Sequence, residues 1–379
     1  LVLHGLVMDI LVPSAFGAEA VVKRQLYKLG YADTIALDGK ISLSGDWNDV
    51  AKLNVFLRSG ERVLIKLSSF SATTFDEVYD NVSKVRWHEF MDKSACVLVD
   101  VKSVNSVLGA VKSIGGVMKK AIMDSLYSKY HVTLTENGAR YIVGLNIKND
   151  VATLTLDTSG EGLHKRGYRT LAYSAPLKET LAATLIDLTV YNKDKYFADL
   201  FCGSGTLPIE ACLKALNIAP GKSRNFDFEN WKNVDKSYVK RAKEEALDGE
   251  IREKIKVFAY DINKNAISIA RFHAKNAGVE DCIHFQASDM REFSSAKKYG
   301  VICSNPPYGE RLGEEKEITK LYKDFGDLYR SLPDWNAYIL TSHPLFESCF
   351  GKNADKRRKL FNANLQCYFY SYMSKKPTS

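Results

Sequence analysis

The sequence lacks several patterns that mark particular classes of protein. Its seven cysteines include no CxxC pair and are odd in number, so neither a disulfide framework nor a structural zinc site is predicted. No apolar run reaches the roughly 18 residues of a membrane-spanning helix, and the histidines show no metal-ligand spacing. Low-complexity segments and internal repeats are absent. We therefore expect a cytoplasmic protein with no metal and no membrane partner.

A secretory signal peptide is also not expected at the start of the sequence. Residues 1–20 are apolar and contain small side chains, but they lack a basic region, and Asp9 interrupts the apolar stretch. The pattern instead predicts a strand at 9–12 and a helix at 18–29.

The composition is that of a globular protein. Hydrophobic residues make up 45% and charged residues 26% of the 379 residues, a length that indicates two or three domains. Lysine and arginine number 53 against 45 acidic residues, which gives a net charge of +8. This excess is compatible with a nucleic-acid partner, but many soluble proteins share it.

The pattern of predicted strands and helices changes near residue 170. Short strands and helices alternate before it, and longer strand–helix repeats follow it, which indicates an α/β fold with a parallel sheet covered on both faces. The last two strands, 359–362 and 366–372, have no helix between them and predict an antiparallel end to that sheet. We expect four parts: 1–60, 61–157, a glycine-rich basic linker at 158–175, and 176–379.

A glycine loop lies in the fourth part. The segment 199–206 (DLFCGSGT) follows a predicted strand and opens a predicted helix, and Gly203 and Gly205 would let the backbone approach a ligand closely. A dinucleotide fingerprint fits poorly, because its third glycine would fall at Pro208 and its acidic residue is missing. An ordinary glycine turn is the alternative.

Two acidic residues follow later strands. Asp261 ends the predicted strand 256–260, where a carboxylate can accept both hydroxyls of a ribose. Asp289 follows the strand 283–286 and would accept from an adenine amino group, with Met290 packed on the ring. The alternatives are a helix N-cap for Asp261 and a capping turn for Asp289.

The sequence Asn-Pro-Pro-Tyr at 305–308 follows the apolar strand 300–304. Two adjacent prolines form a stiff loop that cannot join a strand ladder. Asn305 is therefore predicted to be held at the edge of the sheet, with Tyr308 beside it.

Together these motifs resemble those of amino-directed S-adenosylmethionine (SAM)-dependent methyltransferases, with 199–206 similar to motif I and 305–308 to motif IV. The segments 163–169 and 175–181 resemble one subfamily, the THUMP-domain RNA guanine-N2 methyltransferases of UPF0020 type, in particular those that act on large-subunit ribosomal RNA. Three further segments fit the same pattern: 219–221, 309–312 and 356–362.

The resemblance implies a Rossmann-like class I methyltransferase domain with a seven-stranded, mostly parallel sheet that has an antiparallel end. A ferredoxin-like segment and a THUMP RNA-binding domain would precede it, and the cofactor would be SAM. The residues expected at the cofactor are Asp199, Cys202, Gly203, Gly205, Thr206, Asp261, Ile262, Asp289 and Met290. The residues expected at the reacting base are Asn305, Pro306, Pro307 and Tyr308.

This loop chemistry suits a weakly nucleophilic exocyclic amine. The side-chain oxygen of Asn305 and the carbonyl of Pro306 would both accept from the amine, which directs its lone pair toward the methyl group. Tyr308 would stack on the flipped base. Such a displacement needs alignment more than a strong base or a metal.

Basic and aromatic residues are mixed in the linker, as expected for contacts with RNA phosphates and bases. The residues expected to bind RNA are His164, Lys165, Arg166, Tyr168 and Arg169. A solvated charged linker is the alternative. We interpret the basic cluster at 356–359 as surface charge, and a lid is one possible role for the long polar insert 217–254.

The leading hypothesis is methylation of a guanine N2 amine in 23S ribosomal RNA. A tRNA guanine-N2 methyltransferase and an adenine-N6 DNA methylase are the alternatives with the same chemistry. A non-catalytic RNA-binding assembly factor is the alternative from another class. The sequence predicts neither the modified nucleotide nor the oligomeric state.

Overall fold

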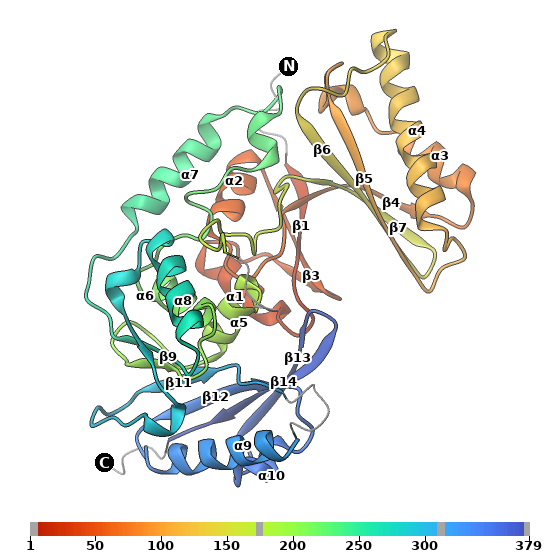
Figure 1. Ribbon diagram of the computed structural model, residues 1–379. Coiled ribbons are helices and arrows are strands. Elements are labelled where there is room, and N and C mark those ends of the chain that lie inside the picture. The colour runs from red at the N-terminus through yellow and green to blue at the C-terminus, as the bar shows by residue number, and fades with distance from the viewer. Residues whose placement is uncertain (1–6, 172–176, 309–314, 375–379) are drawn as a thin grey trace. The chain divides into compact units, whose positions relative to one another are not determined.

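The computed structural model describes residues 7–171, 177–308 and 315–374 (Figure 1). Its internal contacts divide the chain into two compact units, and neither is continuous in sequence. The first unit comprises Leu1–Ser14, Leu26–Leu163 and Arg224–Glu245. The second comprises Ala15–Gln25, His164–Ser223 and Ala246–Ser379.

The first unit contains one seven-stranded sheet in the order β2-β3-β1-β4-β7-β6-β5. Its strands are β1 (Met8–Pro13), β2 (Ile35–Leu37), β3 (Lys40–Gly45), β4 (Leu64–Ser71), β5 (Cys96–Val104), β6 (Arg140–Lys148) and β7 (Val151–Asp157). All neighbours are antiparallel except β5 and β6. Because β1 pairs with β4, the strands of the two predicted parts 1–60 and 61–157 form a single sheet.

Helices connect several of these strands, and the helix predicted at 18–29 is confirmed. They are α1 (Glu19–Lys28), which crosses from the second unit into the first, α2 (Trp47–Phe56), α3 (Phe75–Ser83) and α4 (Val111–Tyr130). The helix α3 begins with a capping box, because the Thr74 hydroxyl accepts from the Glu77 amide and the Glu77 carboxylate accepts from the Thr74 amide. Short 3-10 turns lie at Trp87–Glu89 and Asp227–Asn230.

Part of the polar insert is built into the core of the first unit. Trp231 is buried, and its ring stacks on Tyr141 with 4.8 Å between centroids. Its indole nitrogen donates to the Arg140 carbonyl at 2.9 Å. Asp227 accepts two hydrogen bonds from the Arg140 guanidinium, at 2.7 and 3.0 Å. The helix α7 (Ser237–Asp248) follows these residues.

The second unit contains the other seven-stranded sheet, in the order β10-β9-β8-β11-β12-β14-β13. Its strands are β8 (Phe197–Asp199), β9 (Val257–Asp261), β10 (Ile283–Ala287), β11 (Val301–Ser304), β12 (Asn336–Thr341), β13 (Lys356–Asn362) and β14 (Leu365–Tyr372). The first five strands in this order are parallel to one another. The strand β14 pairs antiparallel with β12 and also with β13. The predicted mostly parallel sheet with an antiparallel end is confirmed.

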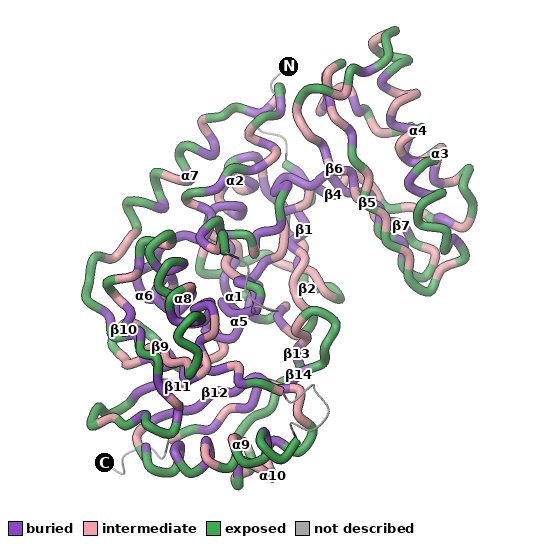
Figure 2. The backbone as a smooth tube through the Cα atoms, in the orientation of Figure 1, coloured by how far each residue is buried: buried purple, intermediate pink, exposed green. Residues whose placement is uncertain are grey.

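Helices cover both faces of this sheet. They are α5 (Glu179–Leu188), α6 (Thr206–Ala215), α8 (Lys264–Asn276), α9 (Glu315–Arg330) and α10 (Phe346–Phe350), with 3-10 turns at Glu280–Cys282 and Met290–Glu292. Alternate residues of β11 enter the two cores: Val301 packs with α5, α6 and α8, and Ile302 with α9 and α10. Figure 2 shows the buried central strands β11 and β12. No described helix is long and apolar enough to span a bilayer.

Candidate functional site

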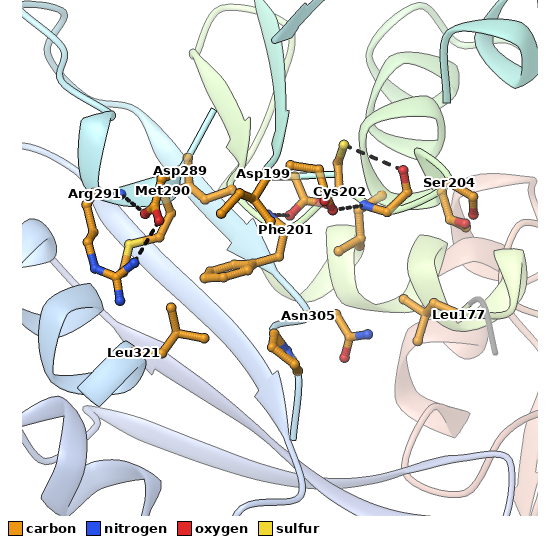
Figure 3. Close-up of a pocket in the computed structure, with 17 residues that line it drawn as sticks. Leu177, Asp199, Phe201, Cys202, Ser204, Asp289, Met290, Arg291, Asn305 and Leu321 are labelled. Atoms are coloured by element: carbon orange, nitrogen blue, oxygen red, sulfur yellow. Dashed lines mark hydrogen bonds and ion pairs between the residues drawn. The ribbon is translucent and has the colours of Figure 1, made fainter. Parts of the chain in front are cut away.

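A cavity of about 470 Å³ lies in the second unit, at the carboxyl ends of its parallel strands (Figure 3). Four successive polar residues reach it: Asp199 ends β8, Asp261 ends β9, Asp289 follows β10, and Asn305 follows β11. Ligands of open α/β sheets bind at this edge, and the volume is typical of a small-molecule site.

Most of the predicted residues line this cavity. They are Asp199, Cys202, Gly203, Thr206, Asp261, Ile262, Asp289, Met290, Asn305 and Pro307. Gly205, Pro306 and Tyr308 are not among the lining residues. The lining residues that were not predicted are Leu177, Leu200, Phe201, Ser204, Leu207, Arg291 and Leu321. Five of them carried a signal. Leu200, Phe201 and Ser204 lie in the segment 199–206, Leu177 lies in the segment 175–181, and Arg291 directly follows Met290.

The glycine loop is fastened to the next strand. The Gly203 amide donates to Oδ2 of Asp261 at 2.9 Å, and the Cys202 amide donates to the Tyr260 carbonyl at 2.8 Å. Gly205 has a φ of +85°, and a Cβ there would lie 2.9 Å from the Cβ of Ala270 on α8. Only glycine meets both requirements, so packing against α8 explains the residue at this position.

Asp261 is not the cap of the following helix. Asn263 is the N-cap of α8, and its side chain accepts from the amides of Asn265 and Ala266. The Asp261 carboxylate accepts from Gly203 and, through Oδ1, from the Asn263 amide at 2.9 Å. Each carboxylate oxygen has a second acceptor site, so Asp261 can also accept from a ligand in the cavity.

Asp199 is a buried carboxyl group. It accepts from the Phe201 amide at 3.1 Å, and the Ser304 hydroxyl also hydrogen-bonds to it. Burial raises the pKa of Asp199 to about 7, and the nearby charge of Asp261 adds a smaller increase. A group of this kind changes its charge near neutral pH, and a positively charged ligand would favour its ionised form.

Asp289 is paired within the protein. Its Oδ1 accepts from the Arg291 amide at 2.9 Å, so it caps the turn Met290–Glu292, as the capping alternative predicted. Its Oδ2 accepts from Nη1 of Arg291 at 2.7 Å, and Nε of Arg291 bonds Asp324 at 2.6 Å. Figure 3 shows this pair at one end of the cavity. Contact between Asp289 and an adenine stays a prediction.

The Asn-Pro-Pro-Tyr loop presents Asn305 and Pro307 to the cavity. The Tyr308 ring packs against the core of the sheet, and its hydroxyl donates to Oδ1 of Asn305. Burial raises the pKa of this hydroxyl, so it remains protonated. The carbonyl of Pro307 accepts from the Tyr322 hydroxyl at 2.7 Å, which fixes the loop.

The prediction that Arg166 and Tyr168 contact RNA directly is wrong in this structure, because both side chains are buried. Nε of Arg166 and the Tyr168 hydroxyl lie 3.3 and 3.2 Å from Oε1 of Glu210 on α6. Arg169 is paired with Glu179 at 2.5 Å. His164 is half-buried and Lys165 is exposed, so their contact with RNA stays a prediction.

A buried histidine forms a hydrogen bond with the backbone of the glycine loop. Nδ1 of His273, on α8, lies 3.1 Å from the Ser204 carbonyl oxygen. Since a carbonyl only accepts, Nδ1 carries the proton of a neutral ring, and burial lowers the pKa of His273. No sequence pattern predicts this contact, because no other histidine lies on α8.

The cavity suits a small ligand with positive charge. Three carboxyl groups and one guanidinium line it, together with the apolar side chains of Ile262, Met290 and Leu321. Ile262 is 73% exposed, so it offers an open apolar surface to a planar ring. Among the described residues, no group of three or more His, Cys, Asp and Glu side chains could hold a metal ion.

Three family models match successive parts of the chain. Residues 9–64 match an RlmL ferredoxin-like domain, and 72–157 match a THUMP domain. Residues 166–371 match the methyltransferase domain called UPF0020, RMKL-like.

Named relatives cover most of the chain. It is 40% identical over 363 residues to "Putative RNA methyltransferase YpsC" of Bacillus subtilis, a match that covers 95% of this chain and 94% of that protein. It is 32% identical to "Ribosomal RNA large subunit methyltransferase K/L" of Psychromonas ingrahamii, with 95% of this chain and 49% of that protein covered. The chain therefore spans about half the length of the K/L relatives.

Solved structures share the whole architecture. The structure titled "Crystal structure of SMU.472, a putative methyltransferase complexed with SAH" (S-adenosylhomocysteine) superposes with a TM-score of 0.93 at 37% identity, over 98% of this chain and 99% of that one. A protein from Listeria monocytogenes titled "predicted N6-adenine-specific DNA methylase" superposes with a TM-score of 0.92 at 39% identity, over 98% and 97%.

Proposed function

Because this chain belongs to the UPF0020 family of RMKL-like methyltransferases, we propose that it methylates the N2 amine of a guanine in 23S ribosomal RNA. It is a SAM-dependent RNA methyltransferase, and the base and the RNA are the proposed parts. The observation that carries the proposal is the Asn305 amide, which lines the same cavity as Asp199 and Asp261. Its place of action would be the cytoplasm.

We expect the cavity residues to contact each part of the cofactor. Asp261 would accept the ribose hydroxyls, and Ile262 and Met290 would pack on the adenine ring, with its amino group near Asp289. The first turn of α6 favours a carboxylate, since the amino end of a helix is partly positive. Bound SAM supplies a methyl group on a positively charged sulfur, and the Asp199 carboxylate complements that charge.

Asn305 and the backbone of Pro306 would hold the amine. Their oxygens accept its two hydrogens, which leaves the nitrogen lone pair directed toward the methyl group. An acceptor that is already positioned lowers the barrier because no reorganisation is needed. The displaced proton passes to water after transfer, so no strong base is needed at the site.

RNA is favoured over DNA by the N-terminal half of the chain. Residues 72–157 match a THUMP domain, and 9–64 match a domain of the RlmL type. The K/L relatives are named for ribosomal RNA of the large subunit, which favours this RNA over tRNA. We propose that the chain has the parts 1–60, 61–157, 158–175 and 176–379, of which the second captures RNA.

The decisive experiment compares RNA from a strain that lacks the gene with RNA from its parent. Mass spectrometry should show that one N2-methylguanosine is missing from 23S ribosomal RNA and is restored by the wild-type gene. Loss of a tRNA methylation instead, or of N6-methyladenine from DNA, would reject the proposed substrate. No lost methylation in any nucleic acid would favour a non-catalytic assembly factor.

Purified variants test the site itself. Asn305→Ala should abolish transfer of tritiated methyl groups to RNA from the deletion strain, with SAM affinity kept within a few-fold. Asn353→Ala, an exposed asparagine of the same unit, is the matched control and should be fully active. Asp261→Ala should weaken SAM binding by about 10- to 100-fold, since charged hydrogen bonds are lost. Unchanged affinity would refute its role.

A further inference from the structure

The second unit contains another cavity, and its lining is strongly basic. It has a volume of about 620 Å³, and its charged lining consists of Arg24 from α1, Lys356, Arg357 and Arg358 from β13, and Asp187 at the end of α5. We call it the basic groove. Resting on the proposed function, we propose that the basic groove binds backbone phosphates of the substrate RNA beside the catalytic loop.

The loop before α1 packs on β13 and so brings Arg24 to the groove. Nη1 of Arg358 donates to the Gly17 carbonyl at 3.1 Å, and the rings of Phe16 and Phe361 meet edge to face with centroids 5.6 Å apart. A Cβ on Gly17 would lie 2.7 Å from the Lys359 carbonyl oxygen, so the two segments are in close contact. The cations of two distant segments therefore share one surface.

Two carboxylates near the groove, Asp187 and Glu347, are already paired. Asp187 lies 2.9 Å from Nζ of Lys214 and accepts from Gln25 at 2.6 Å. Glu347 lies 3.7 Å from Arg357. Within the described part of the chain, Arg24 and Lys356 have no ion pair, and both are exposed. The groove therefore keeps an excess of positive charge, which attracts a polyanion.

The position of β13 links this charge to the reaction. Leu360 of β13 is paired with Cys367 of β14, and Sγ of Cys367 lies 3.9 Å from the hydroxyl oxygen of Tyr308 in the catalytic loop. The seven-residue strand spans about 20 Å, with its basic end at the groove. An RNA strand whose base enters at Asn305 would have its neighbouring phosphates within reach of Arg24 and Lys356.

Charged residues on an edge strand also discourage pairing with other sheets. The test must therefore separate this protective role from the binding of RNA phosphates. The variant Arg24→Gln/Lys356→Gln removes two cations and keeps Arg357, Arg358 and Lys359 on the edge. The matched control Arg252→Gln/Lys298→Gln removes one arginine and one lysine that are exposed on the same unit outside the groove. SAH binding by calorimetry and monodispersity by light scattering confirm that each variant is folded.

Binding of a fluorescein-labelled single-stranded RNA 20-mer is measured by anisotropy across a salt series. The groove variant should bind about tenfold more weakly at low salt, and its salt slope should fall by about 1.4, or roughly 0.7 for each phosphate contact. The control variant should match the wild type. Equal binding by all three proteins would overturn the groove proposal and leave the proposed function standing.

Two further outcomes have separate meanings. No binding and no methylation of any RNA by the wild type would overturn the proposed function and, with it, the groove. Unchanged RNA binding with a loss of binding to vesicles rich in phosphatidylserine would assign the groove to a membrane surface and reject RNA as its ligand.

Discussion

The hydroxyl of Tyr308 donates a hydrogen bond to the side-chain oxygen of Asn305, three residues before it. This contact sets the orientation of the Asn305 amide group, with its oxygen toward the Tyr308 hydroxyl. The oxygen keeps one further acceptor position, so it can still accept from a substrate amine. Tyr308 therefore acts in this structure as a positioning residue, with its ring packed against the core of the sheet.

Replacing Tyr308 by phenylalanine removes this donor and keeps the ring. We expect kcat to fall about 2- to 10-fold, because one hydrogen bond is worth about 0.5–1.5 kcal/mol, while SAM affinity is unchanged. Single-turnover methylation and calorimetry measure the two quantities. Tyr308→Ala should lose more if the ring also stacks on the base, as the sequence predicted. Equal losses in both variants would show that the ring contributes nothing to base binding.

The raised pKa of Asp199 predicts that SAM binding depends on pH. The group is about half protonated near pH 7, and a cationic ligand binds better to its ionised form. We expect affinity for SAM to fall by up to about tenfold per pH unit below pH 7, with a smaller effect for SAH, which lacks the sulfonium charge. Calorimetry from pH 5.5 to 8.5 measures this, and the dependence should disappear in Asp199→Asn.

The same group predicts an opposite effect on the stability of the free protein. Its folded-state pKa of about 7 lies above the ordinary 3.8, so the stability that it contributes is complete below pH 4 and is lost as the pH rises through 7. Asp199→Asn should therefore unfold at a higher temperature than the wild type at pH 8, without ligand. A lower unfolding temperature for this variant at pH 8 would contradict the assignment.

Gly205→Ala tests the packing of the glycine loop. The substitution places a methyl group against Ala270 and forces a left-handed conformation that costs about 1–2 kcal/mol. We expect SAM affinity to fall more than about tenfold. Gly278→Ala is the control, because Gly278 also has a positive φ but nothing lies within 4 Å of its added Cβ. Similar losses of SAM affinity in both variants would show that the contact with Ala270 is unimportant.

The buried pair of Arg166 and Glu210 predicts a loss of stability. Arg166→Ala leaves the Glu210 carboxylate without its guanidinium partner in the core, which should lower the free energy of unfolding by about 3–5 kcal/mol. Urea unfolding measures this. Lys165→Ala, an exposed neighbour, should change it by less than about 0.5 kcal/mol. Normal stability of Arg166→Ala with weakened RNA binding would restore the original prediction.

The same residues show what sequence patterns cannot provide. Basic and aromatic residues at 164–169 match an RNA-binding pattern, but Glu210, the partner of Arg166 and Tyr168, lies on α6, 44 residues beyond Arg166. Such a partner is defined only by the fold. The residues Asp199, Asp261 and Asn305 were predictable because each directly follows or ends a strand, and parallel strands bring their carboxyl ends to one edge.

Some elements had no recognisable periodicity. The first eight residues of α5, Glu179–Ile186, are all buried, so the helix shows no alternation of polar and apolar faces. The strand β13 begins at Lys356, three residues before the predicted start. The prediction missed these residues because four consecutive basic residues do not resemble a strand. Both form because neighbouring elements pack or pair with them.

The burial of Trp231 in the first unit determines the order in which the chain can complete its parts. During synthesis from the amino end, Tyr141 emerges 90 residues before its stacking partner Trp231. The strand β8 and the glycine loop of the second unit must be made in between. The first unit is therefore complete only after residues 224–245 have been synthesised. The second unit, in turn, includes residues 15–25, which are synthesised early. A cut in the linker would leave two fragments, each without a piece of its own core.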